Sequence, residues 1–140
     1  MLVRLLYASR AVDTSPSALE GILKVAREHN LDHGITGVLI YQGGVFLQAL
    51  EGGRRAVNDL FGAIQRDRRH KDVELLLFEE IVQRSLCGWA MGLVDVERVN
   101  PGTLLRYSDG QGLNPYAVSG RTSLAFIEDL TATAAICGHT

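Results

Sequence analysis

Hydrophobic positions along the first hundred residues follow two different spacings. Five apolar runs have the length and the alternation of β-strands, and glycine, proline or polar residues separate them. These predicted strands cover residues 1–9, 35–41, 45–50, 73–82 and 89–96. Residues 15–30 and 51–70 instead carry apolar side chains at i, i+3 and i+4, which predicts an amphipathic helix in each range. The order of elements is therefore βαββαββ.

This order is typical of the α+β ferredoxin-like fold, a split-βαβ sheet, here with one added strand. Right-handed crossovers would place both helices on one face of the sheet. We expect the first and third strands to be parallel neighbours at its centre. The chain then divides into a domain over residues 1–96 and an extension over residues 97–140. In the extension, a Gly-rich loop (108–120) precedes an Ala-rich helix (123–136) that we expect to pack on the open face of the sheet.

Two polar side chains interrupt apolar strand faces. Gln48 shares its face with Phe46 and Leu50, and Tyr7 shares its face with Val3. Burying an amide without partners would cost roughly 2–7 kcal/mol, so Gln48 needs a hydrogen-bond partner. A cross-strand hydrogen bond, or a position near the rim of the sheet, would supply one. A bound ligand would also supply one.

A ligand slot follows if Tyr7 and Gln48 both face the helices. The phenol and the amide would then lie beneath a gap between the two helices, with Asn30 at its rim and Ile22 and Ile64 along its walls. Such a slot suits a flat aromatic ligand with a polar edge. Asn30 also has an ordinary explanation, because Asn often ends a helix in a left-handed backbone conformation.

Two other groups have ordinary explanations on the residues alone. Asp67, Arg69 and His70 lie where the second helix should end, and basic groups suit the negative end of a helix dipole. Trp89 and Met91 share one face of the fifth predicted strand, where such a pair usually packs in the core.

Composition and charge narrow the class of function. The 140 residues carry a net charge of −2, and Asp67 interrupts the basic cluster 66–71, so we expect no direct nucleic-acid binding. No apolar run approaches the ~20 residues of a membrane span, which predicts a cytoplasmic protein without a membrane segment. Cys87 and Cys137 lack the spacing of a zinc site, so no metal is expected. The absence of phosphate-binding and nucleophile motifs argues against an enzyme.

Four short fragments occur in order along the predicted domain. They are RLLYAS around Tyr7, Asn30 shortly before GITG, FLQALEG around Gln48 and WAMGL around Trp89. Together they resemble the BLUF family, the flavin-binding blue-light sensor domains, from about residue 1 to residue 96. The length of the chain is similar to that of the short stand-alone members. Leu86 departs from the family pattern, because many relatives have an aromatic residue there.

The resemblance implies a flavin held noncovalently between the two helices, usually FAD, with FMN or riboflavin as alternatives. Asn30 would hydrogen-bond the polar edge of the flavin ring, and Gln48 would bridge Tyr7 and the ring. The side chains implied around the flavin are Tyr7, Ile22, His29, Asn30, Gln48, Ile64, Asp67, Arg69 and His70. Trp89 and Met91 would relay the signal toward the C-terminal extension.

In that family, blue light drives electron and proton transfer from the tyrosine to the flavin, and the glutamine then rearranges its hydrogen bonds. An amide suits this role because rotation or tautomerisation exchanges its donor and acceptor ends. The resemblance therefore implies a photoreceptor without catalytic turnover, which signals to a downstream protein partner and could form a homodimer through the sheet or the tail. Two alternatives stay open on the residues: a light-independent regulatory module that binds another small molecule, and an acylphosphatase-like hydrolase on the same scaffold.

Overall fold

The computed structural model describes residues 1–86, 90–110 and 112–132. Its strands are β1 (Leu2–Ala11), β2 (Thr36–Gln42), β3 (Val45–Gly53), β4 (His70–Ile81) and β5 (Gly92–Asp95). Its helices are α1 (Pro16–His33), α2 (Arg54–Arg66), α3 (Pro101–Leu105) and α4 (Gly120–Ala132), with a short 3₁₀ turn, η1, at Val96–Arg98. The predicted α+β class and the order βαββαββ are confirmed.

The five strands form one sheet in the order β4-β1-β3-β2-β5. β1 and β3 are neighbours, as predicted, but the predicted parallel direction is wrong, because they pair in antiparallel register. The right-handed crossover through α1 makes β1 and β2 parallel and leaves room for one strand between them. β3 returns from β2 through a tight hairpin, fills that space and therefore runs opposite to both. The hairpin turns at Gly43 and Gly44, whose φ angles of 58° and 82° favour glycine.

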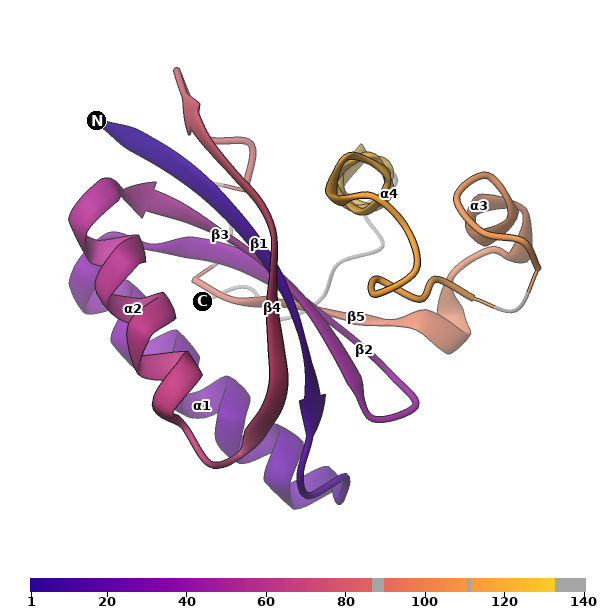
Figure 1. The fold of residues 1–140 in the computed structure, drawn as a ribbon, viewed down its shortest axis with the longest axis horizontal. Helices are drawn as coiled ribbons and strands as arrows, with labels where there is room; N and C mark the ends of the chain where they lie inside the picture. Colours follow the sequence, from indigo (N-terminus) through magenta and orange to yellow (C-terminus); the bar gives the residue numbers. More distant parts are fainter. Residues whose placement is uncertain (87–89, 111, 133–140) are drawn as a thin grey trace.

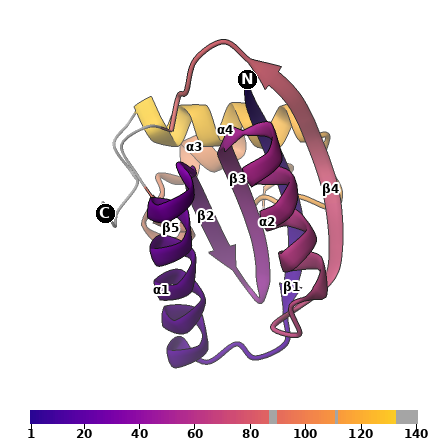
Figure 2. The same ribbon diagram turned by 90° about the vertical axis from the view of Figure 1, so that its left-hand side faces the viewer.

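Helices cover both faces of the sheet. α1 and α2 lie on one face, and α3 and α4 lie beyond the other (Figures 1 and 2). Because side chains alternate along each strand, one sheet supplies two cores. The core facing α1 and α2 includes Leu5, Ile22, Leu39, Leu50 and Val57. The core facing α4 includes Leu6, Ile40, Leu47, Ile127 and Leu130.

α1 extends three residues beyond its predicted end. Ser15 caps its first turn by accepting a hydrogen bond from the backbone N–H of Ala18, and Pro16 takes the first helical position. The helix ends at Gly34, which adopts a left-handed φ of 67° and donates its N–H to the Asn30 carbonyl. Asn30 is itself helical, so the explanation that it ends the helix is wrong.

Several other boundaries differ from their predicted positions. β4 begins at His70, three residues early, because its first residues pair with the end of β1. β5 has four residues instead of the predicted eight, and residue 89 lies outside the described residues. α4 begins at Gly120, whereas its predicted end at residue 136 lies outside the described residues. The pattern of the sequence does not predict the short α3.

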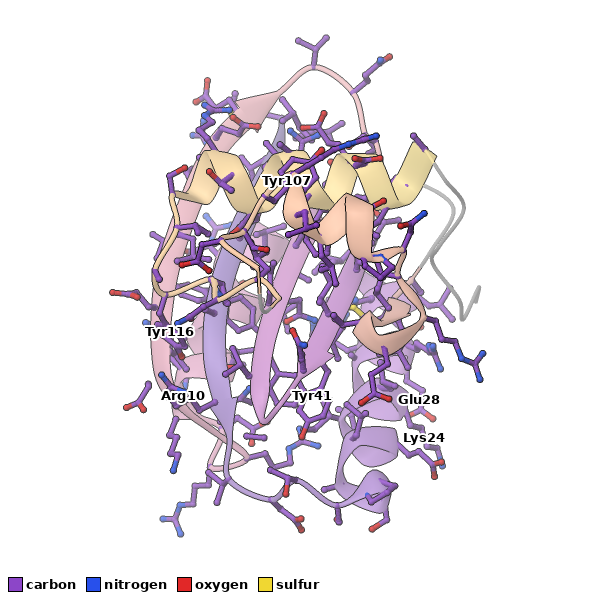
Figure 3. All side chains as sticks on the ribbon, turned by 90° about the vertical axis from the view of Figure 1, so that its right-hand side faces the viewer. Arg10, Lys24, Glu28, Tyr41, Tyr107 and Tyr116 are labelled. Carbon is purple, nitrogen blue, oxygen red and sulfur yellow. The ribbon has the colours of Figure 1, made fainter. Side chains whose placement is uncertain are left out.

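The loop before α4 is attached to the far end of β1 and the start of β4. The Tyr116 hydroxyl donates to the Asp72 carbonyl at 2.7 Å. The Arg10 guanidinium lies 4.6 Å from the centre of the Tyr116 ring (Figure 3) and pairs with the Asp72 carboxylate at 3.4 Å. A cation facing an aromatic ring adds a modest attraction at a partly exposed site. These contacts hold the extension against the sheet at a point remote from α4.

Gly37 on β2 tests how tightly the sheet packs. A Cβ at this position would lie 2.6 Å from the Ala49 carbonyl oxygen and 3.2 Å from the Met91 methyl carbon. Gly37→Ala should therefore lower the free energy of unfolding by about 1–3 kcal/mol, measured by urea denaturation. Gly21→Ala is the matched control, because Gly21 is exposed within α1 and no atom would contact its Cβ. This control should raise stability by about 0.5–1 kcal/mol. Equal stability of the two variants would contradict the packing argument.

Candidate functional site

A cavity of about 220 Å³ lies between α1 and α2, above the central strands. All nine side chains predicted around a ligand line it, from five different elements and the turn after α2. They are Tyr7, Ile22, His29, Asn30, Gln48, Ile64, Asp67, Arg69 and His70. Met91, predicted as part of a signal relay, also reaches this wall. The structure thus gathers residues that are up to 84 positions apart in the chain, from Tyr7 to Met91, around one space.

Sequence reasoning missed five apolar members of the cavity wall. They are Val25, Ala26, Leu39, Leu60 and Ala63. The helical spacing contained the signal for four of them. Val25 and Ala26 follow Ile22 at i+3 and i+4, and Leu60 precedes Ala63 and Ile64 by three and four residues.

Tyr7 and Gln48 face each other directly across the β1–β3 pairing. The Tyr7 hydroxyl donates a hydrogen bond to Gln48 Oε1, and both side chains are buried. Gln48 Nε2 donates to the thioether sulfur of Met91 at 3.3 Å. The cross-strand partner expected for the amide is therefore present, but its nitrogen has only a weak acceptor. The donor capacity of this nitrogen is not fully used.

The environment of Tyr7 keeps its phenol protonated. Burial raises the pKa of Tyr7 well above its ordinary value, and the negative charge of Asp67 raises that pKa further. The ring packs against Phe61, with 5.5 Å between ring centres. Because the phenol keeps its proton, Tyr7 can donate to Gln48, whose amide oxygen is turned toward it.

Asn30 has one amide atom in use and one without a partner. Its Nδ2 donates to the Ala90 carbonyl at 2.6 Å. Its Oδ1 is buried and accepts no hydrogen bond from any described residue. A buried acceptor without a donor costs free energy, so such atoms usually mark the place of a ligand or an ordered water.

Charged and titratable groups surround one side of the cavity. Asp67 follows the last residue of α2, and Arg69 folds back to pair with its carboxylate at 2.6 Å. This hydrogen bond lowers the pKa of Asp67. This segment therefore ends α2, as predicted, and also lines the cavity.

His70 connects the charged side of the cavity to its aromatic floor. Its Nδ1 lies 2.9 Å from Ser9 Oγ, and its ring packs against Phe46 with 5.3 Å between ring centres. Burial lowers the pKa of His70 below 6.5, the adjacent Arg69 lowers it further, and Asp67 opposes both effects. The lowered pKa favours the neutral imidazole.

The Met91 backbone is fixed by α1. Arg27 Nε donates to the Met91 carbonyl at 3.0 Å, and the Met91 side chain is fully buried. The other predicted relay residue, Trp89, lies outside the described residues.

Two other classes of feature have no candidate in the described part of the chain. No group of three or more His, Cys, Asp or Glu side chains within it could hold a metal ion. No helix within it combines the length and the hydrophobicity needed to cross a bilayer.

Comparisons with known proteins agree on one family. The family model described as "BLUF: Sensors of blue-light using FAD" matches residues 2–92. The photoactivated adenylate cyclase subunit alpha of Euglena gracilis is 39% identical over 84 residues, which make up 59% of this chain and 8% of that protein. The blue light- and temperature-regulated antirepressor BluF of Escherichia coli is 32% identical over 97 residues, or 69% of this chain and 24% of that protein. The chain thus spans a quarter or less of the length of these two relatives.

A solved structure of similar length covers the whole chain. BlsA in its photo-activated state superposes with a TM-score of 0.83 at 31% identity, over 100% of this chain and 99% of that one.

The lowered pKa of His70 has a consequence for stability. The unfolded chain binds a proton on this imidazole below about pH 6.5, whereas the folded chain resists it, so stability should fall as the pH drops below 6.5. His29, whose pKa is lowered by burial and by His33, contributes in the same direction. Urea midpoints between pH 5.5 and 7.5 should therefore rise with pH, and His70→Asn should flatten this rise. A variant that keeps the wild-type slope would exclude His70 as its source.

Proposed function

The chain belongs to the BLUF family of flavin-based blue-light sensors, and we propose that within it Tyr7 and Gln48 form the light-responsive pair and that FAD is the flavin held in the cavity. The bound flavin absorbs blue light and can accept an electron. The observation that carries the proposal is the buried hydrogen bond from the Tyr7 phenol to the Gln48 amide in the wall of a cavity.

The residues of the cavity fit a flavin ring. The wall is mostly apolar, and Ile22 and Ile64 approach from the two helices that flank it. The polar edge of the ring carries donors and acceptors, and the wall offers one of each. These are the oxygen of Asn30, which has no partner among the described residues, and the weakly engaged nitrogen of Gln48. Asp67 and Arg69 add polar contacts on one side of the cavity.

In darkness, the proton on Tyr7 sets the orientation of Gln48. The phenol donates to the amide oxygen, so the amide nitrogen points away from Tyr7 toward Met91. Any event that removes the phenol proton leaves this oxygen without its donor. Rotation or tautomerisation of the amide would then present a different group to the cavity and to Met91.

Met91 offers a path from the amide to the rest of the chain. Its sulfur contacts Gln48, and the following residue begins β5, the edge strand beside β2. We infer that a change at Gln48 shifts the equilibrium position of this segment and that the signal passes to a downstream protein partner or to a second copy of the chain. No catalytic turnover is required for this function.

The hydrolase alternative loses support from the fold. An acylphosphatase-like site needs a loop after the first strand to surround a phosphate. Residues 8–11 instead continue β1, and their register partners lie on β3 and β4.

Absorption spectroscopy tests the light-responsive pair. The purified protein should be yellow, and blue light should shift its flavin absorption reversibly to the red. Tyr7→Phe and Gln48→Ala should each retain the flavin and lose this shift, because each removes one partner of the buried hydrogen bond. Tyr41→Phe and Gln42→Ala on β2 are matched controls outside the cavity and should respond as the wild type does. A normal photocycle in Tyr7→Phe or Gln48→Ala would exclude that residue from the pair.

The unpartnered oxygen of Asn30 supports a second prediction. Asn30→Ala removes an acceptor for the ligand and should weaken FAD binding by about 2- to 10-fold, measured by titration of the flavin-free protein. Asn58→Ala, on the exposed side of α2, should bind like the wild type. Unchanged affinity and an unchanged dark spectrum in Asn30→Ala would separate Asn30 from the flavin. Mass spectrometry of flavin released from the purified protein would distinguish FAD from FMN and riboflavin.

A further inference from the structure

The connection from β4 to β5 joins the two opposite edges of the sheet and covers residues 82–91, called here the crossing segment. After β4, its described residues 82–86 turn over the end of the sheet (Figure 2). Residues 87–89 lie outside the described residues. The described parts, 82–86 and 90–91, are each bound to the domain by side chains.

Glu51, at the end of β3, binds the first part of the crossing segment. Its carboxylate is fully buried, and Oε1 accepts from the backbone N–H groups of Ser85 at 2.9 Å and Leu86 at 2.7 Å. Oε2 accepts from Ser85 Oγ at 3.0 Å and pairs with Arg4 at 2.7 Å. Because a buried carboxylate without such partners is strongly disfavoured, the charge requires this arrangement of the backbone.

Arg84 binds the same part of the segment to the start of β2. Its guanidinium donates to the Gly34 carbonyl at 2.6 Å and to Thr36 Oγ1 at 3.2 Å. Arg84 therefore adds a second attachment next to the one made by Glu51.

The second part of the segment ends in the cavity. Met91 lies between Gln48 and α1, and Gly37 leaves room for its methyl group. Five peptide steps separate Leu86 from Met91 and can span at most about 18 Å. The hydrogen bonds from the Ser85 and Leu86 backbone to Glu51, called here the anchor, therefore limit where Met91 can lie.

A chain of ion pairs connects Glu51 to the C-terminal extension. Arg4, which pairs with Glu51, also pairs with Glu79 of β4 at 2.6 Å. Glu79 pairs with Arg121 of α4 at 3.0 Å. The side chain of Leu86 packs in the core that faces α4.

We propose that Glu51 is a positioning residue of the light response: by fixing the backbone of Ser85 and Leu86, it sets the position from which Met91 meets Gln48. This inference rests on the proposed function. Loss of the anchor should leave the cavity intact but make the contact between Met91 and the amide less constrained.

Glu51→Gln tests this role with little change of shape. The substitution removes the charge and places an N–H donor against either Arg4 or the two backbone N–H groups. In darkness, the Ser85 and Leu86 amides should exchange their hydrogens at least about 10-fold faster than in the wild type. After a blue-light pulse, recovery of the dark spectrum should be at least about threefold faster at unchanged flavin content. A purely structural role would leave that recovery rate unchanged.

Two more variants complete the experiment. Glu80→Gln makes the same chemical change in an exposed ion pair with Arg54 and should behave like the wild type. Arg84→Ala loosens the segment without unpairing the buried carboxylate, so it should accelerate both rates, and it decides the question if Glu51→Gln does not fold.

The outcomes separate the two proposals. A wild-type light response with unchanged recovery in Glu51→Gln and Arg84→Ala would overturn the positioning role and leave the proposed function standing, even if amide exchange were faster. A wild-type protein that binds flavin without responding to light would overturn both.

Discussion

The buried hydrogen bond between Tyr7 and Gln48 depends on the register of β1 against β3. The two residues are direct partners in the antiparallel pair, so their side chains emerge on the same face at close range. A slip of one residue would move one of them to the face covered by α4. Apolar side chains on both faces of the two strands oppose such a slip, because it would exchange the two cores.

The wall of the cavity contains polar atoms whose hydrogen-bonding capacity is not fully used. Buried polar groups normally find full hydrogen-bond partners, yet among the described residues the Asn30 oxygen has none and the Gln48 nitrogen has only a sulfur atom. If no ligand bound here, apolar side chains at these two positions would give a more stable core, because they would leave no polar atom buried without a partner. Under the proposed function, a flavin with donors and acceptors at its edge would supply partners for both amides.

The sheet connects this cavity to the C-terminal extension on its other face. Glu51 lies three residues beyond Gln48 on the same strand, so it points to the opposite side. There it joins the ionic chain through Arg4 and Glu79 to α4. The segment that carries Met91 into the cavity is therefore attached to the network that also contacts the extension.

The sequence determined the local features of this protein. Alternation and helical spacing gave the element order, the hairpin and the two polar positions, Tyr7 and Gln48, because these patterns depend only on near neighbours in the chain. Strand direction and the burial of Glu51 depended on tertiary structure. Both are decided by contacts between residues distant in sequence. β3 fills the space between β1 and β2, and Arg4 and two backbone N–H groups bind a carboxylate that looks exposed in the sequence.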